Sequence, residues 1–223
     1  MVEEEFILVG GSSEIAQKFY DICIANNIRT TVITSNKEKA KNIDNSFLVH
    51  DYLKDYEKIL KKIIDKKNII VIFFNGVLYE NRPSQFPTQN QQLLTTKINF
   101  LIPYNLCKKL NNDYPGESKF VFISTMAAIK PRYKNYLYGL SKFSLEESIK
   151  KLALPNFLII RFGKVTTKMS EGHDFAPFTL TPEEAAGKLF SKVKKRGIKY
   201  PNFGLLLISI LIKFLPKRIS DKF

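Results

Sequence analysis

A tyrosine and a lysine four positions apart, Tyr138 and Lys142, are the side chains in this sequence best suited to proton transfer. On a helix this spacing places both on one face, one turn apart. A free phenol has a pKa near ~10, and a neighbouring ammonium group stabilises its ionised form. An apolar segment upstream ends in two hydroxyl residues, Ser124 and Thr125. We therefore expect a proton-donating site at the end of a strand. The alternative is a surface tyrosine beside a salt-bridging lysine.

The first apolar segment, residues 6–9, runs directly into a glycine turn. Glycine lets the backbone approach a pyrophosphate closely, and the start of a following helix offers unpaired N–H groups and a positive dipole end. The turn departs from the G-x-G-x-x-G pattern because Glu14 and Ala16 stand where later glycines belong. An ordinary strand-to-helix turn is therefore the alternative. The candidates for nucleotide contact are Gly10, Gly11, Ser12, Ser13, Glu14 and Ile15.

Six short segments are continuously apolar instead of alternating, and a helix or connecting segment separates each from the next. This pattern is typical of parallel strands buried on both faces. We predict a three-layer α/β fold with a doubly wound parallel sheet, a Lys-rich helix near 53–66 and long helices through Asn99 and Tyr138. Residues 1–199 are expected to form one domain and 200–223 a tail. The predicted strands are residues 6–9, 30–34, 47–49, 69–74, 120–123 and 157–160.

The composition is that of a globular protein, since 44% of the 223 residues are hydrophobic and 13% are aromatic. Cys23 and Cys107 lie in apolar helical patterns and lack metal-ligand spacing to His50 or His173, so we expect buried free thiols and no metal site. The acidic start of the chain does not resemble a secretory signal, and no apolar run reaches the roughly 18–20 residues that span a bilayer. These features predict a cytoplasmic protein.

The C-terminal tail combines an apolar run with basic flanks in a chain of formal net charge +14. Residues 205–212 are apolar except for Ser209. Such a segment is typical of an amphipathic helix lying on an anionic membrane surface, here the inner face of the cytoplasmic membrane. A subunit-packing helix or a core helix is the alternative. Nucleic-acid binding is not expected, because the basic residues are interleaved with aliphatic side chains and not with stacking aromatics. The basic residues are Lys192, Lys194, Lys195, Arg196, Lys199, Lys213, Lys217, Arg218 and Lys222.

The order of the motifs along the chain resembles the short-chain dehydrogenase/reductase family, and the resemblance covers nearly the whole sequence. It implies a Rossmann fold that binds a nicotinamide dinucleotide, and an enzyme that forms a homodimer or homotetramer. The matching motifs are residues 9–16, Asp51, Asn75-Gly76, Asn99, Ser124-Thr125, Tyr138 with Lys142, and residues 161–169.

The resemblance implies a role for each residue of the proton-transfer site. Tyr138 would act as general acid or base, and Lys142 would lower the pKa of its phenol and bind the nicotinamide ribose. Thr125 stands where the family usually has the serine that orients the substrate, and Ser124 is the alternative for this role. Asn99 would hold a water molecule that connects Lys142 to solvent.

The resemblance also implies cofactor contacts. Asp51, followed by Tyr52, would bind the adenine, while Asn75-Gly76 ends a strand where the family usually has Asn-Asn-Ala-Gly. The carboxamide end of the nicotinamide would contact the segment that contains Gly163, Val165, Thr166 and Thr167.

The end of the second predicted strand bears on cofactor choice. An acidic residue there favours NAD, because it binds both ribose hydroxyls, whereas a 2′-phosphate requires small or basic groups. This sequence has Ser35, Asn36 and Lys37 at that place, with no acid before Glu38. We therefore expect NADP(H) to be preferred over NAD(H).

Four segments further resemble the decaprenylphosphoryl-ribose 2-epimerase reductase subunit and its bacterial relatives: residues 8–16, 161–169, 176–186 and the tail. This branch implies reduction of a ketone, or the reverse, on a lipid-linked or nucleotide-linked keto-sugar in cell-envelope polysaccharide synthesis. A general 3-ketoacyl or keto-lipid reductase is one alternative. A non-catalytic regulatory protein that binds a dinucleotide is another.

Overall fold

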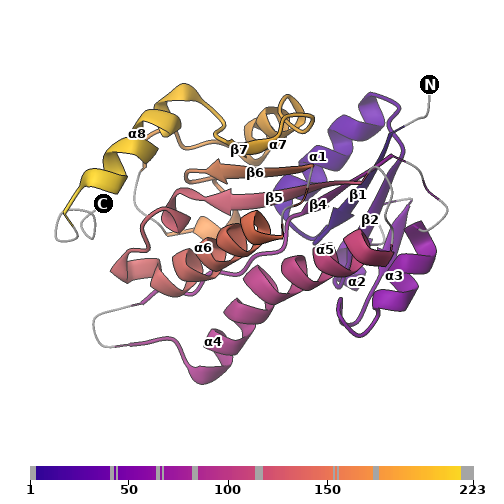
Figure 1. The fold of residues 1–223 in the computed structure, drawn as a ribbon, viewed down its shortest axis with the longest axis horizontal. Helices are drawn as coiled ribbons and strands as arrows, with labels where there is room; N and C mark the ends of the chain where they lie inside the picture. The colour runs from indigo at the N-terminus through magenta and orange to yellow at the C-terminus, as the bar shows by residue number, and fades with distance from the viewer. Residues whose placement is uncertain are drawn as a thin grey trace.

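The protein forms a seven-stranded sheet in which all strands are parallel, in the order β3-β2-β1-β4-β5-β6-β7 (Figure 1). The computed structural model describes residues 4–40, 43, 45–63, 66, 68–81, 85–113, 118–152, 154, 156–172 and 176–216. The strand order reverses direction between β1 and β4, as in a doubly wound sheet. The predicted α/β fold is therefore confirmed.

The six predicted strands are present, each within two residues of its expected ends. A seventh strand, β7, was missed because its three residues include a glycine and a lysine and are only half-buried, so they give no apolar run. The strands are β1 Glu5–Val9, β2 Thr30–Thr34, β3 Ser46–Leu48, β4 Ile69–Phe73, β5 Lys119–Thr125, β6 Phe157–Phe162 and β7 Gly197–Lys199.

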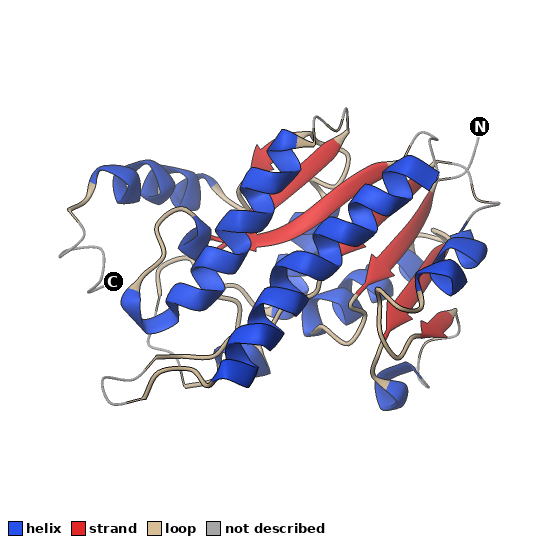
Figure 2. Ribbon diagram, turned by 60° about the horizontal axis from the view of Figure 1, so that its bottom comes forward, coloured by secondary structure: helices blue, strands red, loops and turns tan. Residues whose placement is uncertain are grey.

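Helices cover both faces of the sheet, and two of them, α5 and α6, lie side by side across one face (Figure 2). The same face carries α3, whereas α1 and α7 pack on the opposite face. The three-layer arrangement places an apolar core on each side of the sheet. The helices are α1 Glu14–Ala25, α2 Lys37–Ala40, α3 Tyr56–Ile63, α4 Gln89–Thr96, α5 Ile102–Asp113, α6 Tyr136–Lys151, α7 Pro182–Phe190 and α8 Phe203–Phe214.

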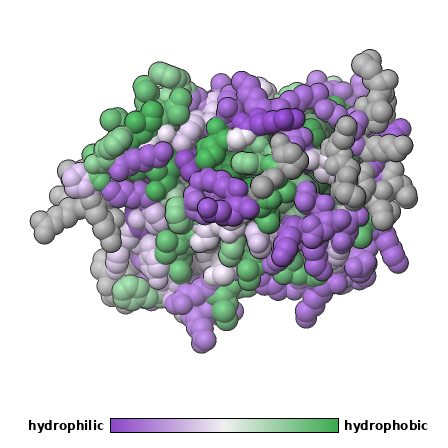
Figure 3. Space-filling view, in the orientation of Figure 1, coloured by the Kyte–Doolittle hydropathy of each residue, from purple (hydrophilic) through white to green (hydrophobic). Residues whose placement is uncertain are grey.

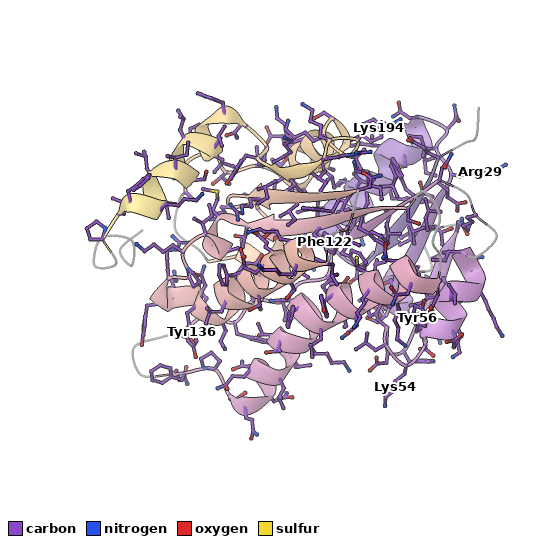
Figure 4. The ribbon with its side chains drawn as sticks, viewed as in Figure 1. Arg29, Lys54, Tyr56, Phe122, Tyr136 and Lys194 are labelled. Atoms are coloured by element: carbon purple, nitrogen blue, oxygen red, sulfur yellow. The ribbon has the colours of Figure 1, made fainter. Side chains whose placement is uncertain are left out.

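Aromatic rings fill the centre of both cores. Under α1 and α7, the fully buried ring of Phe19 lies 5.6 Å from Phe6, 6.0 Å from Phe74 and 5.9 Å from Phe190, measured between ring centroids. On the other face the ring of Phe122 stacks on the ring of Phe73 from the neighbouring strand β4. The Phe122 side chain lies in the middle of the molecule (Figure 4). Cys23 and Cys107 are buried and free, as predicted.

The long helix expected through Asn99 is interrupted. Between α4 and α5 the residues Lys97–Leu101 form a π-helical turn, which adds one residue to the turn and directs the Asn99 side chain inward. Such turns are frequent at functional sites. Sequence periodicity cannot distinguish this turn from an α-helix, because only one residue is inserted.

The helix predicted in the tail is α8, and its apolar side chains are distributed unusually. Leu205 and Ser209 are buried against the protein. The opposite face is apolar and exposed, which is the green region over α8 in Figure 3. None of the helices in the described part of the chain is long and apolar enough to cross a membrane. Three of the basic residues predicted to flank the run, Lys217, Arg218 and Lys222, lie outside the described residues.

Two close contacts hold the first turn of α8 against the loop that follows β6. A Cβ atom at Gly163 would lie 3.1 Å from Leu205 Cδ2, and a Cβ at Gly204 would lie 2.2 Å from Phe178 Cζ. Asn202 caps the helix through its Oδ1 atom, which accepts a hydrogen bond from Leu205 N at 2.9 Å. The tail helix is therefore packed on the rest of the protein and does not project from it.

The Phe19 cluster gives a test of the core. We expect Phe19→Ala to lower the free energy of unfolding by about 3–5 kcal/mol, because the ring has no solvent exposure and the cavity left behind is enclosed by three other rings. Urea denaturation measures this loss. Ile24→Ala on the same helix, at a side chain that is 52% exposed, should change stability by less than about 0.5 kcal/mol. Equal losses would contradict the described packing.

Candidate functional site

The carboxyl ends of β1, β4, β5 and β6 meet at one edge of the sheet, and they bring the predicted site residues together there. Crevices that bind ligands in doubly wound sheets form at this edge, where the strand order reverses. Here the reversal lies between β1, which leads into Gly10, and β4, which leads into Asn75. The tail helix α8 lies at the same end of the molecule (Figure 1).

The glycine turn after β1 leaves no room for a side chain. Gly10 has a φ of +87°, and a Cβ on it would lie 2.9 Å from the backbone nitrogen of Asn75. The N–H groups of Gly10 and Gly11 both donate to the carbonyl of Ile33, at 2.9 and 3.1 Å. Ser13 precedes α1 without a side-chain cap hydrogen bond. The turn is thus packed tightly against the segment after β4 and leads directly into the start of α1, where a pyrophosphate is expected to bind.

Tyr52 is a buried side chain close to the same edge of the sheet. Burial raises the pKa of its phenol, and the nearby polar groups of Ser35, Asn75 and Gly10 oppose this effect. Three predicted cofactor segments, after β1, β2 and β4, therefore converge on one buried side chain from the segment after β3. Asp51 next to it is already paired, since its carboxylate accepts a hydrogen bond from Lys97 Nζ at 2.6 Å.

The pairing of Asp51 has an electrostatic consequence. The Lys97 ammonium group, helped by the backbone N–H groups of Leu53 and Lys54, holds the pKa of Asp51 below its usual value. Ser35, Asn36 and Lys37 are exposed directly after β2, at the edge where the adenine ribose is expected. The backbone N–H of Asn36 donates to Thr34 Oγ1 at 3.1 Å, which orders the start of this segment.

The proton-transfer pair lies on α6, which approaches the end of β5 very closely. A Cβ at Gly139 would lie 2.8 Å from the carbonyl oxygen of Ala127 and 3.1 Å from Pro131 Cα, so only glycine permits this approach. Thr125 Oγ1 accepts a hydrogen bond from Ala127 N at 3.2 Å, and the Thr125 hydroxyl is near enough to the Tyr138 phenol to lower its pKa. The predicted partners Tyr138 and Thr125 therefore lie near each other.

The pKa of the Tyr138 phenol is raised to about 12, because burial outweighs the hydrogen bond with Thr125 that lowers it. The consequence is a phenol that keeps its proton at neutral pH and is available as a proton donor. The sequence predicts that Lys142 lowers this pKa, and that effect stays a prediction.

Lys142 is buried, and two backbone carbonyls solvate its ammonium group. Its Nζ donates to Asn75 O at 2.9 Å and to Ile123 O at 3.1 Å, so it joins the ends of β4 and β5. A Cβ at Gly76 would lie 4.0 Å from this Nζ. Burial lowers the pKa of Lys142 to about 8, and the Glu146 carboxylate opposes this effect. At neutral pH most molecules still carry the cation.

Asn99 holds the segment after β4 in place. Its Oδ1 accepts from Val77 N at 2.8 Å, and its Nδ2 donates to Val77 O at 2.9 Å and to Ser141 Oγ at 3.0 Å. Ser141 Oγ in turn donates to the carbonyl of Tyr138 at 2.8 Å. Asn99 thus connects Gly76-Val77 to the helix turn that carries the phenol, and the predicted water at Asn99 stays a prediction.

Ser124 and Thr125 face different partners, which separates the two candidates for substrate orientation. Ser124 is buried and donates to Glu146 Oε1 at 2.5 Å, so its hydroxyl is engaged away from Tyr138. Arg161 Nε donates to both oxygens of the same carboxylate, at 3.0 and 3.1 Å, and Arg161 Nη1 donates to Tyr200 Oη at 2.9 Å. Thr125 is therefore the hydroxyl placed next to the phenol.

The Glu146–Arg161 pair was not singled out from the sequence. One signal was available: Glu146 follows Lys142 at the same four-residue spacing that separates Lys142 from Tyr138, so all three lie on one stripe of α6. A second signal was Arg161 inside an otherwise apolar strand, since a buried arginine requires a partner.

The loop after β6 closes over the start of α1. Val165 forms an isolated parallel bridge with Leu180, and Lys168 N donates to Glu14 Oε1 at 2.9 Å. This contact brings together two predicted cofactor segments, and a cavity of about 440 Å³ lies between them. Its lining residues are Glu14, Lys164, Thr166, Thr167, Lys168, Ser170, Glu171 and Gly172.

A substitution at Gly139 tests the approach of α6 to β5. We expect Gly139→Ala to cost about 1–3 kcal/mol of stability, because the new methyl group would press on the backbone at Ala127 and Pro131. Gly187→Ala in α7 is the matched control: no atom lies within 4 Å of its Cβ position, and alanine should be neutral or stabilising by up to about 1 kcal/mol. Thermal unfolding of both variants compares the two effects, and equal shifts would refute the close approach.

Comparison with family models finds no match. An uncharacterized oxidoreductase of Mycobacterium tuberculosis is 30% identical over 109 residues, and the match spans 46% of this chain and 44% of the relative. The chain thus matches less than half the length of that curated relative.

Solved structures match over almost the full chain, although their sequences are only 11–12% identical. A short-chain dehydrogenase from Burkholderia cenocepacia in complex with NADP has a TM-score of 0.78, covering 100% of this chain and 98% of that one. A short-chain dehydrogenase from Sphingobium yanoikuyae in complex with NADPH has a TM-score of 0.77, and the match covers 96% of this chain and 97% of that one. One from Streptomyces avermitilis gives 0.74, covering 93% and 92%. The chain therefore has the Rossmann fold of the short-chain dehydrogenases/reductases.

Proposed function

We propose that this protein is an NAD(P)-dependent oxidoreductase that reduces a ketone to an alcohol or catalyses the reverse reaction. The observation that carries this proposal is the buried Lys142 ammonium, bound to the ends of β4 and β5, with the Tyr138 phenol one helix turn away and the Thr125 hydroxyl near that phenol. The site lies beside a glycine turn suited to a dinucleotide. Two of the neighbours in fold are in complex with NADP or NADPH.

The cofactor would supply the hydride, and the protein's own groups would position the carbonyl and move one proton. Thr125 and Tyr138 present two hydroxyl groups to the same substrate oxygen. As that oxygen gains negative charge, the proton on Tyr138 Oη passes to it. The Lys142 cation stabilises the phenolate that is left, since an opposite charge nearby favours the ionised form. Asn99 keeps the Gly76-Val77 segment in register with this helix turn.

The pKa of Tyr138 suits the reductive direction. A donor must hold its proton, and a phenol whose pKa is raised to about 12 does so throughout the physiological range. Oxidation of an alcohol needs the deprotonated phenol instead, so its rate should rise with pH. The reductive direction is therefore favoured near neutrality.

NADP(H) is the cofactor that the exposed segment after β2 fits best. Ser35, Asn36 and Lys37 would offer a hydroxyl, an amide and an ammonium group to a 2′-phosphate. A carboxylate at this place would repel that phosphate, and the first acid is Glu38. The adenosine half of the cofactor would contact Tyr52, Asp51 and the glycine turn at Gly10.

The substrate we propose is a keto-sugar on a lipid or nucleotide carrier, used in cell-envelope polysaccharide synthesis. Its support is the resemblance of four chain segments to reductases of that class, together with the position of α8 at the same end of the molecule as the site. Exposed Met169 and Phe178 add apolar surface on the loop after β6. A 3-ketoacyl or keto-lipid reductase would use the same chemistry, and a substrate screen separates the two.

We further propose that α8 contacts the inner surface of an anionic membrane, with residues 1–199 as the catalytic part and 200–223 as the membrane-binding tail. A helix in water normally buries its apolar stripe. Here the outward residues are apolar, and Lys213 and the basic segment near Lys199 flank them. Lysines at the rim of an apolar helix suit anionic head groups. The outward residues are Phe203, Leu206, Leu207, Ile210, Leu211 and Phe214.

The catalytic proposal is tested at the phenol. We expect Tyr138→Phe to abolish NADPH oxidation in the presence of a ketone, because phenylalanine has no proton to donate, while NADPH still binds. Fluorescence titration measures the binding, and absorbance at the nicotinamide band measures turnover. Tyr136→Phe, on the same helix (Figure 4), should retain activity. The substrates are keto-sugars on prenyl phosphates and on nucleotides, with a 3-ketoacyl thioester for comparison. Full turnover by Tyr138→Phe would sink the mechanism.

The membrane proposal is tested by substitutions on the exposed face only. Removing the tail after Lys199 would also remove Tyr200 and the buried Leu205, so it would damage the fold. We expect Ile210→Glu with Leu211→Glu to abolish sedimentation with phosphatidylglycerol vesicles, since two charges would enter the apolar layer. Leu93→Glu, at a side chain 63% exposed on α4, is the control. Unchanged sedimentation, or a changed oligomeric state instead, would favour a subunit contact.

A further inference from the structure

The strongest feature outside the proton-transfer pair is a buried charged cluster behind it. The Glu146 side chain is 1% exposed, and the Arg161 side chain is 9% exposed. Arg161 approaches the carboxylate through both Nε and Nη2, which is the bidentate geometry that gives strong and directional pairs. Burying two charges is costly unless every partner is in place. A cluster of this kind at a site edge therefore requires an explanation.

The cluster connects four elements around the site. Ser124 at the end of β5 donates to the carboxylate, Glu146 belongs to α6, and Arg161 belongs to β6. Tyr200 follows β7 and accepts from Arg161 Nη1. The residue after Ser124 is Thr125, whose hydroxyl lies near the Tyr138 phenol. The position of one active hydroxyl is thus set through the backbone by a neighbour that the carboxylate holds.

The same carboxylate acts on Lys142. The two side chains are one helix turn apart on one stripe of α6, and the attraction of Glu146 opposes the effect of burial on the ammonium group. Among the described residues, Tyr138 and Glu146 lie on the same stripe of α6 as Lys142, and Glu146 is the charged group that shifts the pKa of Lys142. The other groups at the ammonium are neutral carbonyls, those of Asn75 and Ile123. Glu146 is the one carboxylate in this set.

We propose that Glu146 is a positioning residue of this site: its carboxylate, fixed by Arg161 and Ser124, keeps Lys142 a cation and holds Thr125 against Tyr138. The proposal rests on the reductase function above, and it extends that function to a residue that touches neither carbonyl nor cofactor. Arg161 fixes the carboxylate and neutralises it in part, so the carboxylate does not take the Lys142 proton.

The direct test measures Lys142 in the protein without added cofactor. NMR titration of ¹³Cε-labelled lysine, with the Lys142 signal assigned by loss in Lys142→Arg, gives its pKa. In Glu146→Gln the carboxylate charge is gone and the Arg161 cation is left, so the pKa of Lys142 should fall by about one unit or more. Glu147→Gln is the matched control, because Glu147 is the next residue and pairs with Lys150 at the surface. Its Lys142 signal should titrate as in the parent protein.

Activity gives a second, independent readout. In Glu146→Gln, kcat/KM for the reduction should fall at a pH about one unit lower than in the parent protein, because the active form needs the Lys142 cation. At pH 8 this shift corresponds to a loss of about five-fold. If Tyr138→Phe retained full turnover, the proposed function would fail, whereas the NMR titration would still decide the role of Glu146.

A second variant distinguishes positioning from stability alone. Glu146→Gln leaves the Arg161 cation buried without its partner. The double variant Glu146→Gln/Arg161→Gln removes both charges, so it should be more stable than Glu146→Gln alone. We expect the pKa of Lys142 in the double variant to stay below the parent value, because the Glu146 carboxylate is still missing. A parent-like Lys142 pKa in the double variant, or in a folded Glu146→Gln, would overturn the proposal.

Discussion

The buried ammonium group of Lys142 is the interaction on which the site depends. A cation taken out of water needs replacement partners, and here two strand ends supply them through the carbonyls of Asn75 and Ile123. Because β4 and β5 are neighbours in the sheet, the ammonium group fixes their ends relative to α6. The same helix then places Tyr138 one turn earlier against Thr125. One buried charge thus aligns the strands, the helix and the proton donor.

Much of the fold was predictable because short-range patterns in the sequence determine it. The strands β1, β4, β5 and β6 each contain a continuous apolar run of four or five residues, and β2 is rich in β-branched residues, as expected of parallel strands covered on both faces. The glycine turn and the spacing of Tyr138 and Lys142 are local as well. Elements without such patterns were missed: β7 contains three half-buried residues, and the π-helical turn at Asn99 adds only one residue to a helical repeat.

The parts of the site that the sequence did not reveal depend on contacts between distant segments. Ser124 and Thr125 are adjacent and chemically similar, so their separate roles become visible only where Glu146 is seen to take the Ser124 hydroxyl. The pKa of Tyr138 is likewise a property of its surroundings, because burial raises it and no spacing rule contains that effect. The ion pair between Asp51 and Lys97 joins segments 46 residues apart, so the sequence did not reveal it, and the predicted role of Asp51 in binding adenine stays a prediction.

The contact between Gly204 and Phe178 makes the tail helix specific to this protein. Phe178 adopts a left-handed backbone with φ of +58°, which is rare for an aromatic residue, and its ring takes the space that a side chain at position 204 would fill. Another apolar helix grafted at this position would lack the glycine that leaves room for the Phe178 ring. The same helix moved to another protein would lose the ring that seats it. The tail helix is consequently not interchangeable, and its sequence and that of the loop after β6 are constrained to change together.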